Sequence, residues 1–197
     1  MSTEFREIDA LSERKQEILQ AAIEIIASEG YGKLTMRAVA RASGMKLGAL
    51  QYHFRTWDDM LRTLAAYIED AYQQSWKALD LNDKEAGLQD LVHFIMDDPA
   101  GAALSGDELF PQLWAMSLVE PAMAEKMDEL YGVYLEKLEA RLAALGSRTP
   151  GPDALTIMSL LEGTMVFVGE GRRWAKHKNA VRDSIREFLE ARYGDWD

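Results

Sequence analysis

The sequence contains no cysteine among its 197 residues. Disulfide bonds, thiolate metal sites and a cysteine nucleophile are therefore excluded, and the composition suits a reducing cytosol. Only three histidines are present, at positions 53, 93 and 177, so a transition-metal site is not expected. No apolar run approaches the roughly 20 residues of a membrane span. The polar start, MSTEFREIDALSERKQ, lacks the apolar core of a secretory signal. We therefore expect a cytoplasmic protein that makes no contact with the membrane.

Sequence signatures of enzymes are also missing. There is no Ser-His-Asp order with a supporting motif, no Gly-rich phosphate loop and no HExxH motif. An enzyme or a small-molecule carrier built on a helical bundle would need a convergent set of titratable groups, and the sequence shows no such set. We expect no catalytic residues, no bound metal and no cofactor.

The charge of the chain, which totals -11, is unevenly distributed. Residues 1–63 hold nine basic and nine acidic side chains, whereas residues 64–197 hold thirteen basic and twenty-four acidic ones. Between Gly30 and Trp57 there is no acidic residue but there are five basic ones: Lys33, Arg37, Arg41, Lys46 and Arg55. An acidic body repels DNA, so any contact with nucleic acid is expected in this N-terminal window. Acidic surfaces are common in bacterial-type proteins, but that does not explain why this window escapes the trend.

Apolar residues recur at spacings of three and four, and alternating strand patterns are absent, which predicts an all-α protein. Gly30 and Gly44 are expected to end helices, and Thr35 and Thr56 to cap them. We expect a break or loop at 97–106 and a turn at 146–152. The expected helices span residues 12–29, 35–43, 46–54, 57–79, 82–96, 107–118, 121–145, 153–168 and 179–192. The fourth is long enough to join a DNA-binding domain, residues 1–57, to a regulatory domain, residues 58–197.

The second and third expected helices form a helix-turn-helix pattern. Ala40 is small enough to let the two helices approach, and Gly44, four residues on, suits the tight turn. Leu50 and Phe54 are expected to pack the third helix on the first two. Its outer face is then left with Lys46, Leu47, Ala49, Gln51 and Tyr52. A helix of about nine residues, ~13 Å long, fits a major groove about 12 Å wide.

The segment LTMRAVARASGMKLGALQYHFRTWDDML, Leu34 to Leu61, resembles the DNA-binding segment of the TetR family of transcriptional regulators. The hallmark G-x-L-x-Y-H-F is present as Gly48, Leu50, Tyr52, His53 and Phe54. The likeness covers roughly residues 12–65, and the length and the helical remainder also match the family. It implies an N-terminal three-helix DNA-binding domain joined by a long helix to a C-terminal ligand-binding and dimerisation domain.

The resemblance also implies DNA-contacting residues. Side chains on the recognition helix that would face base edges or sugar are Lys46, Leu47, Gly48, Ala49 and Gln51. Residues that would contact phosphates are Thr35, Arg37, Tyr52 and His53, although His53 could instead satisfy a local backbone group. Lys46, Leu47, Gln51 and Trp57 depart from the common family pattern and suggest a distinct operator. Gln51 can pair with adenine, and Leu47 can touch a thymine methyl group.

Six of the ten methionines lie in residues 80–197, together with several aromatic residues. They could form ordinary core, or they could line an adaptable cavity for an apolar or aromatic ligand. Glu162, among apolar neighbours, could orient a ligand amine or hydroxyl, lie on an exposed face or pair with Arg172. The candidate ligand-binding residues are His93, Phe94, Phe110, Trp114, Met127, Tyr131, Met158, Glu162 and Met165.

In the family, the last two helices of each subunit pack with those of a partner. Leu155, Met158, Leu161, Gly163 and Phe167, with Val181, Ile185, Phe188 and Leu189, offer apolar surface for such a homodimer, or close the monomer core. The sequence therefore favours a homodimeric repressor that binds double-stranded operator DNA and is released by a small-molecule effector. The alternative is a DNA-binding regulator that is controlled by a protein partner or that has no ligand.

Overall fold

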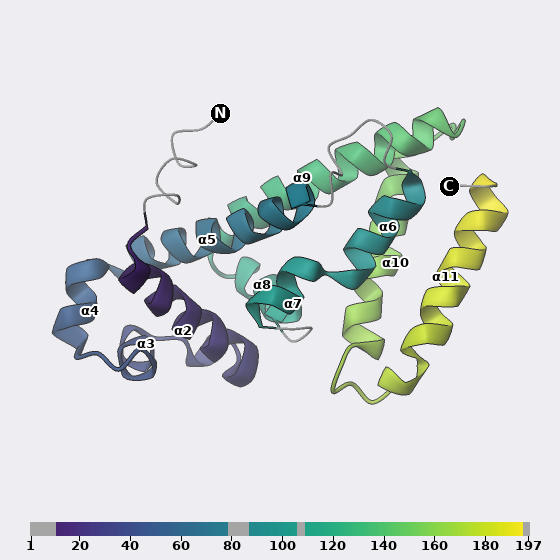
Figure 1. Ribbon diagram of the computed structural model, residues 1–197. Coiled ribbons are helices and arrows are strands. Elements are labelled where there is room, and N and C mark those ends of the chain that lie inside the picture. The colour runs from purple at the N-terminus through teal and green to yellow at the C-terminus, as the bar shows by residue number, and fades with distance from the viewer. Residues whose placement is uncertain (1–10, 79–86, 106–108, 195–197) are drawn as a thin grey trace. The chain divides into compact units, whose positions relative to one another are not determined.

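The fold is given by a computed structural model that describes residues 11–78, 87–105 and 109–194. Every regular element within these ranges is helical (Figure 1), which confirms the all-α prediction. None of the described helices is both long and apolar enough to span a lipid bilayer. The elements are α2 (Glu13–Glu29), η1 (Tyr31–Lys33), α3 (Met36–Ala42), α4 (Leu47–His53), α5 (Trp57–Ala78), α6 (Leu88–Asp97), α7 (Pro99–Leu104), α8 (Leu109–Ser117), α9 (Pro121–Ala144), α10 (Pro150–Val168), η2 (Ala175–His177) and α11 (Lys178–Tyr193).

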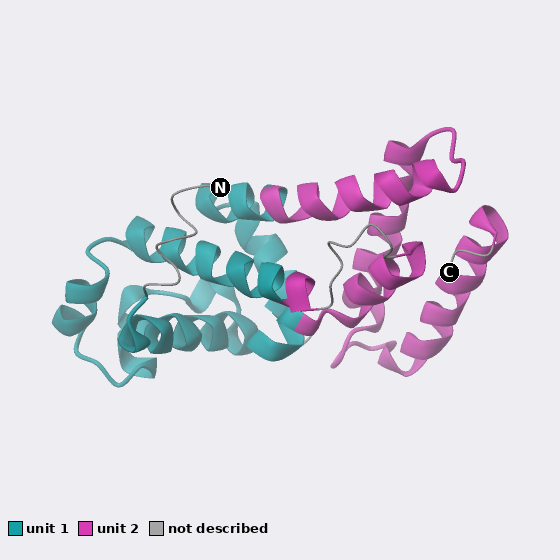
Figure 2. Cartoon of the chain, turned by 45° about the horizontal axis from the view of Figure 1, so that its top comes forward, with its two compact units in different colours: residues 1–74, 100–128 teal, residues 75–99, 129–197 magenta. Residues whose placement is uncertain are grey.

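The chain forms two compact units, which Figure 2 shows in different colours. Unit 1 consists of Met1–Gln74 and Ala100–Asp128, and unit 2 consists of Ser75–Pro99 and Glu129–Asp197. The backbone of α5 therefore starts in unit 1 and ends in unit 2, and so does that of α9. The expected functional boundary after residue 57 remains a prediction.

The helix ends in unit 1 follow local signals in the sequence. The Ser12 hydroxyl accepts a hydrogen bond from the backbone N–H of Lys15 (3.3 Å) at the start of α2. The Thr56 hydroxyl accepts one from the N–H of Asp59 (3.0 Å) at the start of α5. The Asp59 carboxylate in turn accepts from the N–H of Arg55 (3.0 Å), so the expected capping arrangement is present. The core behind these caps is apolar, with Ile18, Leu19, Ile23, Ile26, Val39, Leu50, Phe54, Met60 and Leu64 fully buried.

The expected loop at 97–106 is wrong over most of its length, because Pro99–Leu104 forms the helix α7. Pro99 occupies the first helical position, where its fixed φ is favourable, and three alanines follow within the helix. In the same way, α10 starts at Pro150 rather than at the expected Asp153. The expected start of a helix near Asn82 falls outside the described residues, and the described α6 begins at Leu88.

In unit 2, α10 and α11 run side by side (Figure 1). The far end of α11 is tied to the start of α10, since Arg192 Nη2 donates to Asp153 Oδ1 over 2.8 Å. Ser147 donates to the other carboxylate oxygen of Asp153 over 2.6 Å. The Ser147 hydroxyl, with help from Arg192, lowers the pKa of this carboxyl below its usual value, so it stays ionised and keeps the two helix ends together.

Candidate nucleic-acid interface and a buried aromatic cluster

The helix α4 divides its side chains sharply between the core and the surface. Leu50 within the helix and Phe54 just after it are completely buried, whereas Tyr52 is 86% exposed. The remaining residues predicted to contact DNA are exposed or half-buried: Thr35, Arg37, Lys46, Leu47, Gly48, Ala49, Gln51 and His53. The helix has seven residues, so it is shorter than expected at ~10 Å. It still fits a major groove about 12 Å wide.

The turn between α3 and α4 is fixed by backbone conformation and hydrogen bonds. Gly44 has φ +67°, a value that costs a residue with a side chain about 1–2 kcal/mol. The N–H of Met45 donates to the carbonyl of Ala40 over 2.7 Å, which closes the turn. Ala40 is buried, as its small size predicts. The expected helix-turn-helix geometry is therefore present.

Thr35 holds the start of α3 as expected. Its hydroxyl oxygen accepts a hydrogen bond from the N–H of Ala38 over 3.1 Å. The residue is exposed, so the hydroxyl hydrogen remains available to an acceptor outside the protein, such as a phosphate oxygen. Arg37 lies two residues further on and is also exposed. The first turn of α3 can thus offer both a hydroxyl and a guanidinium group to one phosphate.

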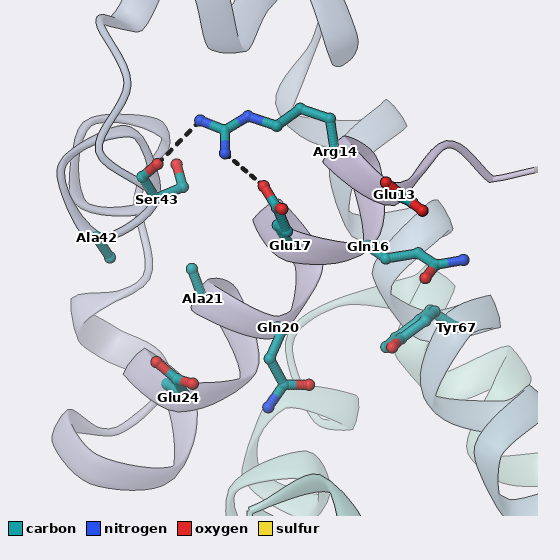
Figure 3. Close-up of a pocket in the computed structure, with 10 residues that line it drawn as sticks. All are labelled: Glu13, Arg14, Gln16, Glu17, Gln20, Ala21, Glu24, Ala42, Ser43 and Tyr67. Carbon is teal, nitrogen blue, oxygen red and sulfur yellow. Dashed lines mark hydrogen bonds and ion pairs between the residues drawn. The ribbon is translucent and has the colours of Figure 1, made fainter.

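Two basic residues of α2 contact the helix-turn-helix, and the sequence analysis identified neither of them. Arg14 donates from Nη2 to the carbonyl of Ser43, in the turn, over 3.1 Å and also pairs with Glu17 (Figure 3). Lys15 places its Nζ 5.2 Å from the ring centroid of Phe54, a cation–π contact. No local motif signals these contacts, because each joins residues about thirty or more positions apart.

The residues around Arg14 line an open groove of about 620 Å³ (Figure 3). Its carboxylates belong to Glu13, Glu17 and Glu24, and Arg14 is the single basic side chain among its lining residues. A groove with this excess of negative charge does not suit a phosphate backbone. The DNA-facing surface of unit 1 is therefore better sought on α3 and α4.

The five basic side chains of the acid-free window, at positions 33, 37, 41, 46 and 55, are all exposed. In the described part of the chain, none of them forms an ion pair. Exposed cations without partners contribute little to folding, but they can replace the counterions of a DNA duplex. Tyr52 and His53 lie beside them, with ring centroids 5.6 Å apart in an edge-to-face arrangement.

The residues predicted to bind a ligand are divided between the two units. Phe110, Trp114 and Met127 belong to unit 1. Phe110 is buried and packs edge-on against Tyr72, with ring centroids 5.9 Å apart. Met127 is buried as well, whereas Trp114 is 43% exposed. The six others belong to unit 2: His93, Phe94, Tyr131, Met158, Glu162 and Met165.

Neighbouring residues of α6 face different surroundings in unit 2. His93 is exposed and lines a small cavity of about 180 Å³ with residues of α11 that include Arg182 and Arg186. Phe94 is buried and packs against Trp76 and Tyr134 instead. The structure thus separates these two predicted ligand residues.

Phe94, Trp76 and Tyr134 form a buried group of three rings from α6, α5 and α9. Trp76 and Tyr134 are stacked, with centroids 5.1 Å apart and an angle of 21° between the rings. Phe94 meets both nearly at right angles, at 5.1 Å from Trp76 and 5.9 Å from Tyr134. Such pairs are favourable beyond the area they bury. Sequence reasoning assigned Trp76 only to the spacing of a long helix and so missed its role here.

Two carboxyl groups act electrostatically on Tyr134 of this group of rings. Burial is the main cause that raises the pKa of the Tyr134 hydroxyl, and the negative charges of Asp98 and Glu162 add to it. Burial also raises the pKa of Glu162 to about 7, even though the Tyr131 hydroxyl donates a hydrogen bond to its carboxylate. Asp98 is buried, and it forms the C-cap of α6 directly before α7, with φ +38°. Sequence reasoning missed it because the segment was expected to be a loop.

With this geometry in place, comparison with known proteins is decisive for the N-terminal part. Residues 18–64 match the model of the bacterial regulatory proteins of the tetR family. This segment belongs to the TetR family. The matched residues include all of α3 and α4, so they contain the helix-turn-helix and every residue predicted to contact DNA.

Individual relatives of this chain are helix-turn-helix transcriptional regulators. An HTH-type transcriptional repressor of Mycobacterium tuberculosis is 40% identical over 57 residues, which cover 29% of this chain and 30% of that protein. An HTH-type transcriptional regulator of Xanthobacter autotrophicus is 27% identical over 156 residues, 75% of each chain. The chain thus aligns with less than a third of the first relative and with three quarters of the second.

The fold extends the likeness beyond the DNA-binding segment. A transcriptional regulator of Saccharomonospora viridis, solved in complex with choline, superposes with a TM-score of 0.71 at 20% identity. The match covers 91% of this chain and 97% of that one. At this level of identity the likeness shows a shared fold over nearly the whole chain.

Proposed function

We propose that this chain is a homodimeric TetR-family repressor that binds operator DNA through α3 and α4 and is released by a small molecule bound in unit 2. The observation that carries the proposal is the exposed, acid-free surface of the helix-turn-helix. Its five cations have no ion-pair partner among the described residues, although the whole chain carries a net charge of -11. A repressor of this kind acts beside the chromosome, so the proposal also implies the cytoplasm.

The proposed contacts divide into two classes. Lys46, Leu47, Gly48, Ala49 and Gln51 would read base edges, because they lie at the start and in the first turns of α4 and are exposed or, for Leu47, half-buried. The residues proposed to hold phosphates are Thr35, Arg37, Tyr52 and His53. Phosphate contacts set the register of the helix in the groove, while base contacts set the choice of sequence.

The proposed dimer would use α10 and α11. Leu155, Val166 and Phe167 of α10 and Phe188 of α11 are large apolar side chains that remain exposed in the single chain. Other residues expected on this surface, including Met158, Leu161, Ile185 and Leu189, are buried within the chain. A face that keeps exposed apolar side chains beside a packed helix pair is typical of an interface with a second copy. A two-fold dimer would present two copies of α4 about one DNA turn apart.

Two observations support a small-molecule effector. The related structure from Saccharomonospora viridis holds choline, so this fold can accommodate a small ligand. In unit 2 of the present chain, Phe94, Tyr131 and Glu162 lie in or beside a buried group of rings and carboxyls. A ligand that binds one conformation better by about 1–3 kcal/mol would change operator affinity by roughly 5–150-fold.

Hydrogen bonds within unit 1 connect α2 and η1 to segments that lie about eighty to ninety residues later in the chain. The hydroxyl of Tyr31 donates to the carboxylate of Glu120, at the start of α9. The N–H of Tyr31 donates to Oε1 of Gln112 in α8 over 3.3 Å. Gln20 of α2 donates to the carbonyl of Leu104 in α7 over 3.0 Å. We propose that these contacts carry the effector signal, because they join the helix-turn-helix support to α7, α8 and α9.

The proposal is tested by selecting bound DNA from a random duplex pool and measuring the affinity of the selected site by fluorescence anisotropy at several salt concentrations. We expect a palindromic site and a steep loss of affinity with salt, as phosphate contacts release counterions. Arg37→Ala should reduce the slope of log affinity against log salt by about one for each phosphate that the arginine neutralises. Arg148→Ala, which removes an equally exposed cation from the loop between α9 and α10, serves as the matched control.

The outcomes separate the parts of the proposal. Sequence-independent binding with equal slopes for Arg37→Ala and Arg148→Ala would contradict the DNA-reading role of α3 and α4. Specific binding that no small molecule relieves would contradict the effector role and would favour control by a protein partner. Sedimentation of a single species at monomer mass would contradict the dimer.

A further inference from the structure

The buried hydroxyl of Tyr134 lacks a hydrogen-bond partner. Tyr134 is 6% exposed, and its hydroxyl is the one buried side-chain nitrogen or oxygen without a partner among the described residues. Leaving such a group unpaired costs roughly 1–3 kcal/mol, so folded proteins rarely retain one without a reason. An occupant that completes this hydrogen bond would recover that cost.

The two charged groups that act on this hydroxyl are both negative. Burial is the main cause that raises the pKa of this hydroxyl, and the negative charges of Asp98 and Glu162 raise it further. Asp98 lies one helical turn after Phe94, since its N–H donates to the Phe94 carbonyl over 3.1 Å. Glu162 has no ion-pair partner within the described ranges, and the hydrogen bond that it accepts comes from the neutral hydroxyl of Tyr131. Burial makes the charged form of Glu162 costly, and a positive charge beside its carboxylate would relieve this cost.

The rings add a second feature that favours positive charge. Trp76, Phe94 and Tyr134 are packed within 6 Å of one another, centroid to centroid. The faces of aromatic rings are electronegative and attract cations, tryptophan most strongly. A metal ion is a poor match for such walls, because hard cations require six or more oxygen ligands. An alkylammonium group is larger and weakly hydrated, and it interacts well with rings and carboxylates at once.

We propose that the cation cluster, defined as Trp76, Phe94, Asp98, Tyr131, Tyr134 and Glu162, binds the positively charged head group of an organic ammonium compound. The inference rests on the proposed function, since it names the chemical class of the effector. Glu162 supplies the compensating charge, the rings surround the alkyl substituents, and the Tyr134 hydroxyl hydrogen-bonds a polar group of the ligand. The cluster draws on α5, α6, α9 and α10, so an occupant bridges four helices of unit 2.

The test uses the full chain and three probes of similar size. Choline carries a quaternary ammonium group and ethanolamine a protonated amine, whereas 3,3-dimethylbutan-1-ol is the neutral isostere of choline. Isothermal titration at about pH 8, above the pKa of about 7 of Glu162, keeps this carboxyl ionised. We expect one or both cations to bind at least roughly tenfold more tightly than the neutral alcohol. The preferred cation distinguishes a quaternary ligand from one with N–H donors.

Glu162→Gln should lower the affinity for the preferred cation by roughly tenfold and leave that for the neutral alcohol unchanged, because it removes charge but not volume. Glu136→Gln, an exposed carboxyl on α9, is the matched control and should change neither. Melting temperatures of both variants show that they fold. Tyr134→Phe should weaken ethanolamine or choline binding while raising stability, because it removes the unpaired hydroxyl.

Equal affinities for choline and its neutral isostere, no binding of either cation at millimolar concentration, or an unaltered cation affinity in Glu162→Gln would each overturn this inference. The anisotropy assay keeps the two proposals apart. If the chain binds its operator and responds to a neutral compound only, the effector role stands and the cation cluster does not. If cations bind as expected but the chain does not recognise DNA, the cluster stands and the repressor role fails.

Discussion

The helix-turn-helix of unit 1 and the cation cluster of unit 2 differ in how far their side chains are exposed to solvent. On α3 and α4 the side chains proposed to contact DNA are exposed or half-buried, and a small buried set that includes Leu50 and Phe54 fixes their direction. In the cluster the groups are buried or half-buried, and they come from helices far apart in the chain. A surface that binds a large polyanion can be built locally, whereas a site that encloses a small cation needs several helices to surround it.

The largest effect should come from the helix-turn-helix. Replacing Lys46 and Tyr52 with alanine removes four DNA contacts from a dimer, each worth about 1 kcal/mol, so operator affinity should fall roughly a thousandfold. Anisotropy titrations measure the decrease, and the salt dependence should flatten as well. Both side chains are exposed, so the melting temperature should stay close to that of the parent. An unchanged affinity would remove α4 from the interface.

The next largest effect should come from Glu162 in the cation cluster. The pKa of Glu162, about 7 in the fold against 4.5 in the unfolded chain, is raised by burial and by Asp98, with Tyr131 acting in the opposite direction. The fold therefore retains a proton that the unfolded chain loses, and stability should fall as pH rises from about 4.5 to 7. This decrease is on the order of 3 kcal/mol at most.

Denaturant titrations of the parent and of Glu162→Gln across this pH range isolate the contribution. Tyr131, Tyr134 and Asp98, the groups that act on Glu162, are present in both proteins. The difference between the two curves should widen toward higher pH. Parallel curves would show that Glu162 is well solvated and would weaken the case for a buried cation site.

A smaller effect is expected at the turn of the helix-turn-helix. Gly44→Ala places a side chain at φ +67° and should destabilise the protein by about 1–2 kcal/mol. An added methyl group would meet no atom within 4 Å, so the cost comes from backbone conformation rather than from a clash. Chemical denaturation measures it. A neutral result would mean that the turn can adopt another conformation.

The smallest effect on folding should occur at Gly48, near the start of α4. An added methyl group would meet open space there too, and its φ is not positive. Gly48→Ala should therefore stabilise the helix by up to about 1 kcal/mol. If the missing side chain allows DNA to approach closely, the same substitution lowers operator affinity. If Gly48→Ala is more stable and binds the operator with unchanged affinity, Gly48 has no role in recognition.

The two regions also differ in how well sequence reasoning described them. Gly30, Thr35, Gly44 and Thr56 carry local signals, and the structure places each at the helix end expected of it. The family hallmark located the helix-turn-helix for the same reason, because its spacing lies within one short helix.

Sequence reasoning was weaker wherever a contact joined distant segments. Arg14 could not be linked to Ser43, nor Lys15 to Phe54, because no local pattern records such pairs. In unit 2 the sequence singled out Glu162 and Phe94 but not Trp76 or Asp98. Trp76 fitted the apolar stripe of a long helix, and Asp98 lay in a stretch whose Pro and Gly residues suggested a break rather than the start of α7.

The backbone at Asp98 gives these two regions a short covalent connection. Asp98 belongs to the cation cluster, while Leu104, six residues later, accepts the hydrogen bond from Gln20 of α2. Between them, Pro99 restricts the chain and α7 stiffens it. Asp98 itself holds a left-handed conformation that costs a non-glycine residue about 1 kcal/mol. A ligand that displaces Asp98 would act one residue before the start of α7, so we expect α7 to shift first.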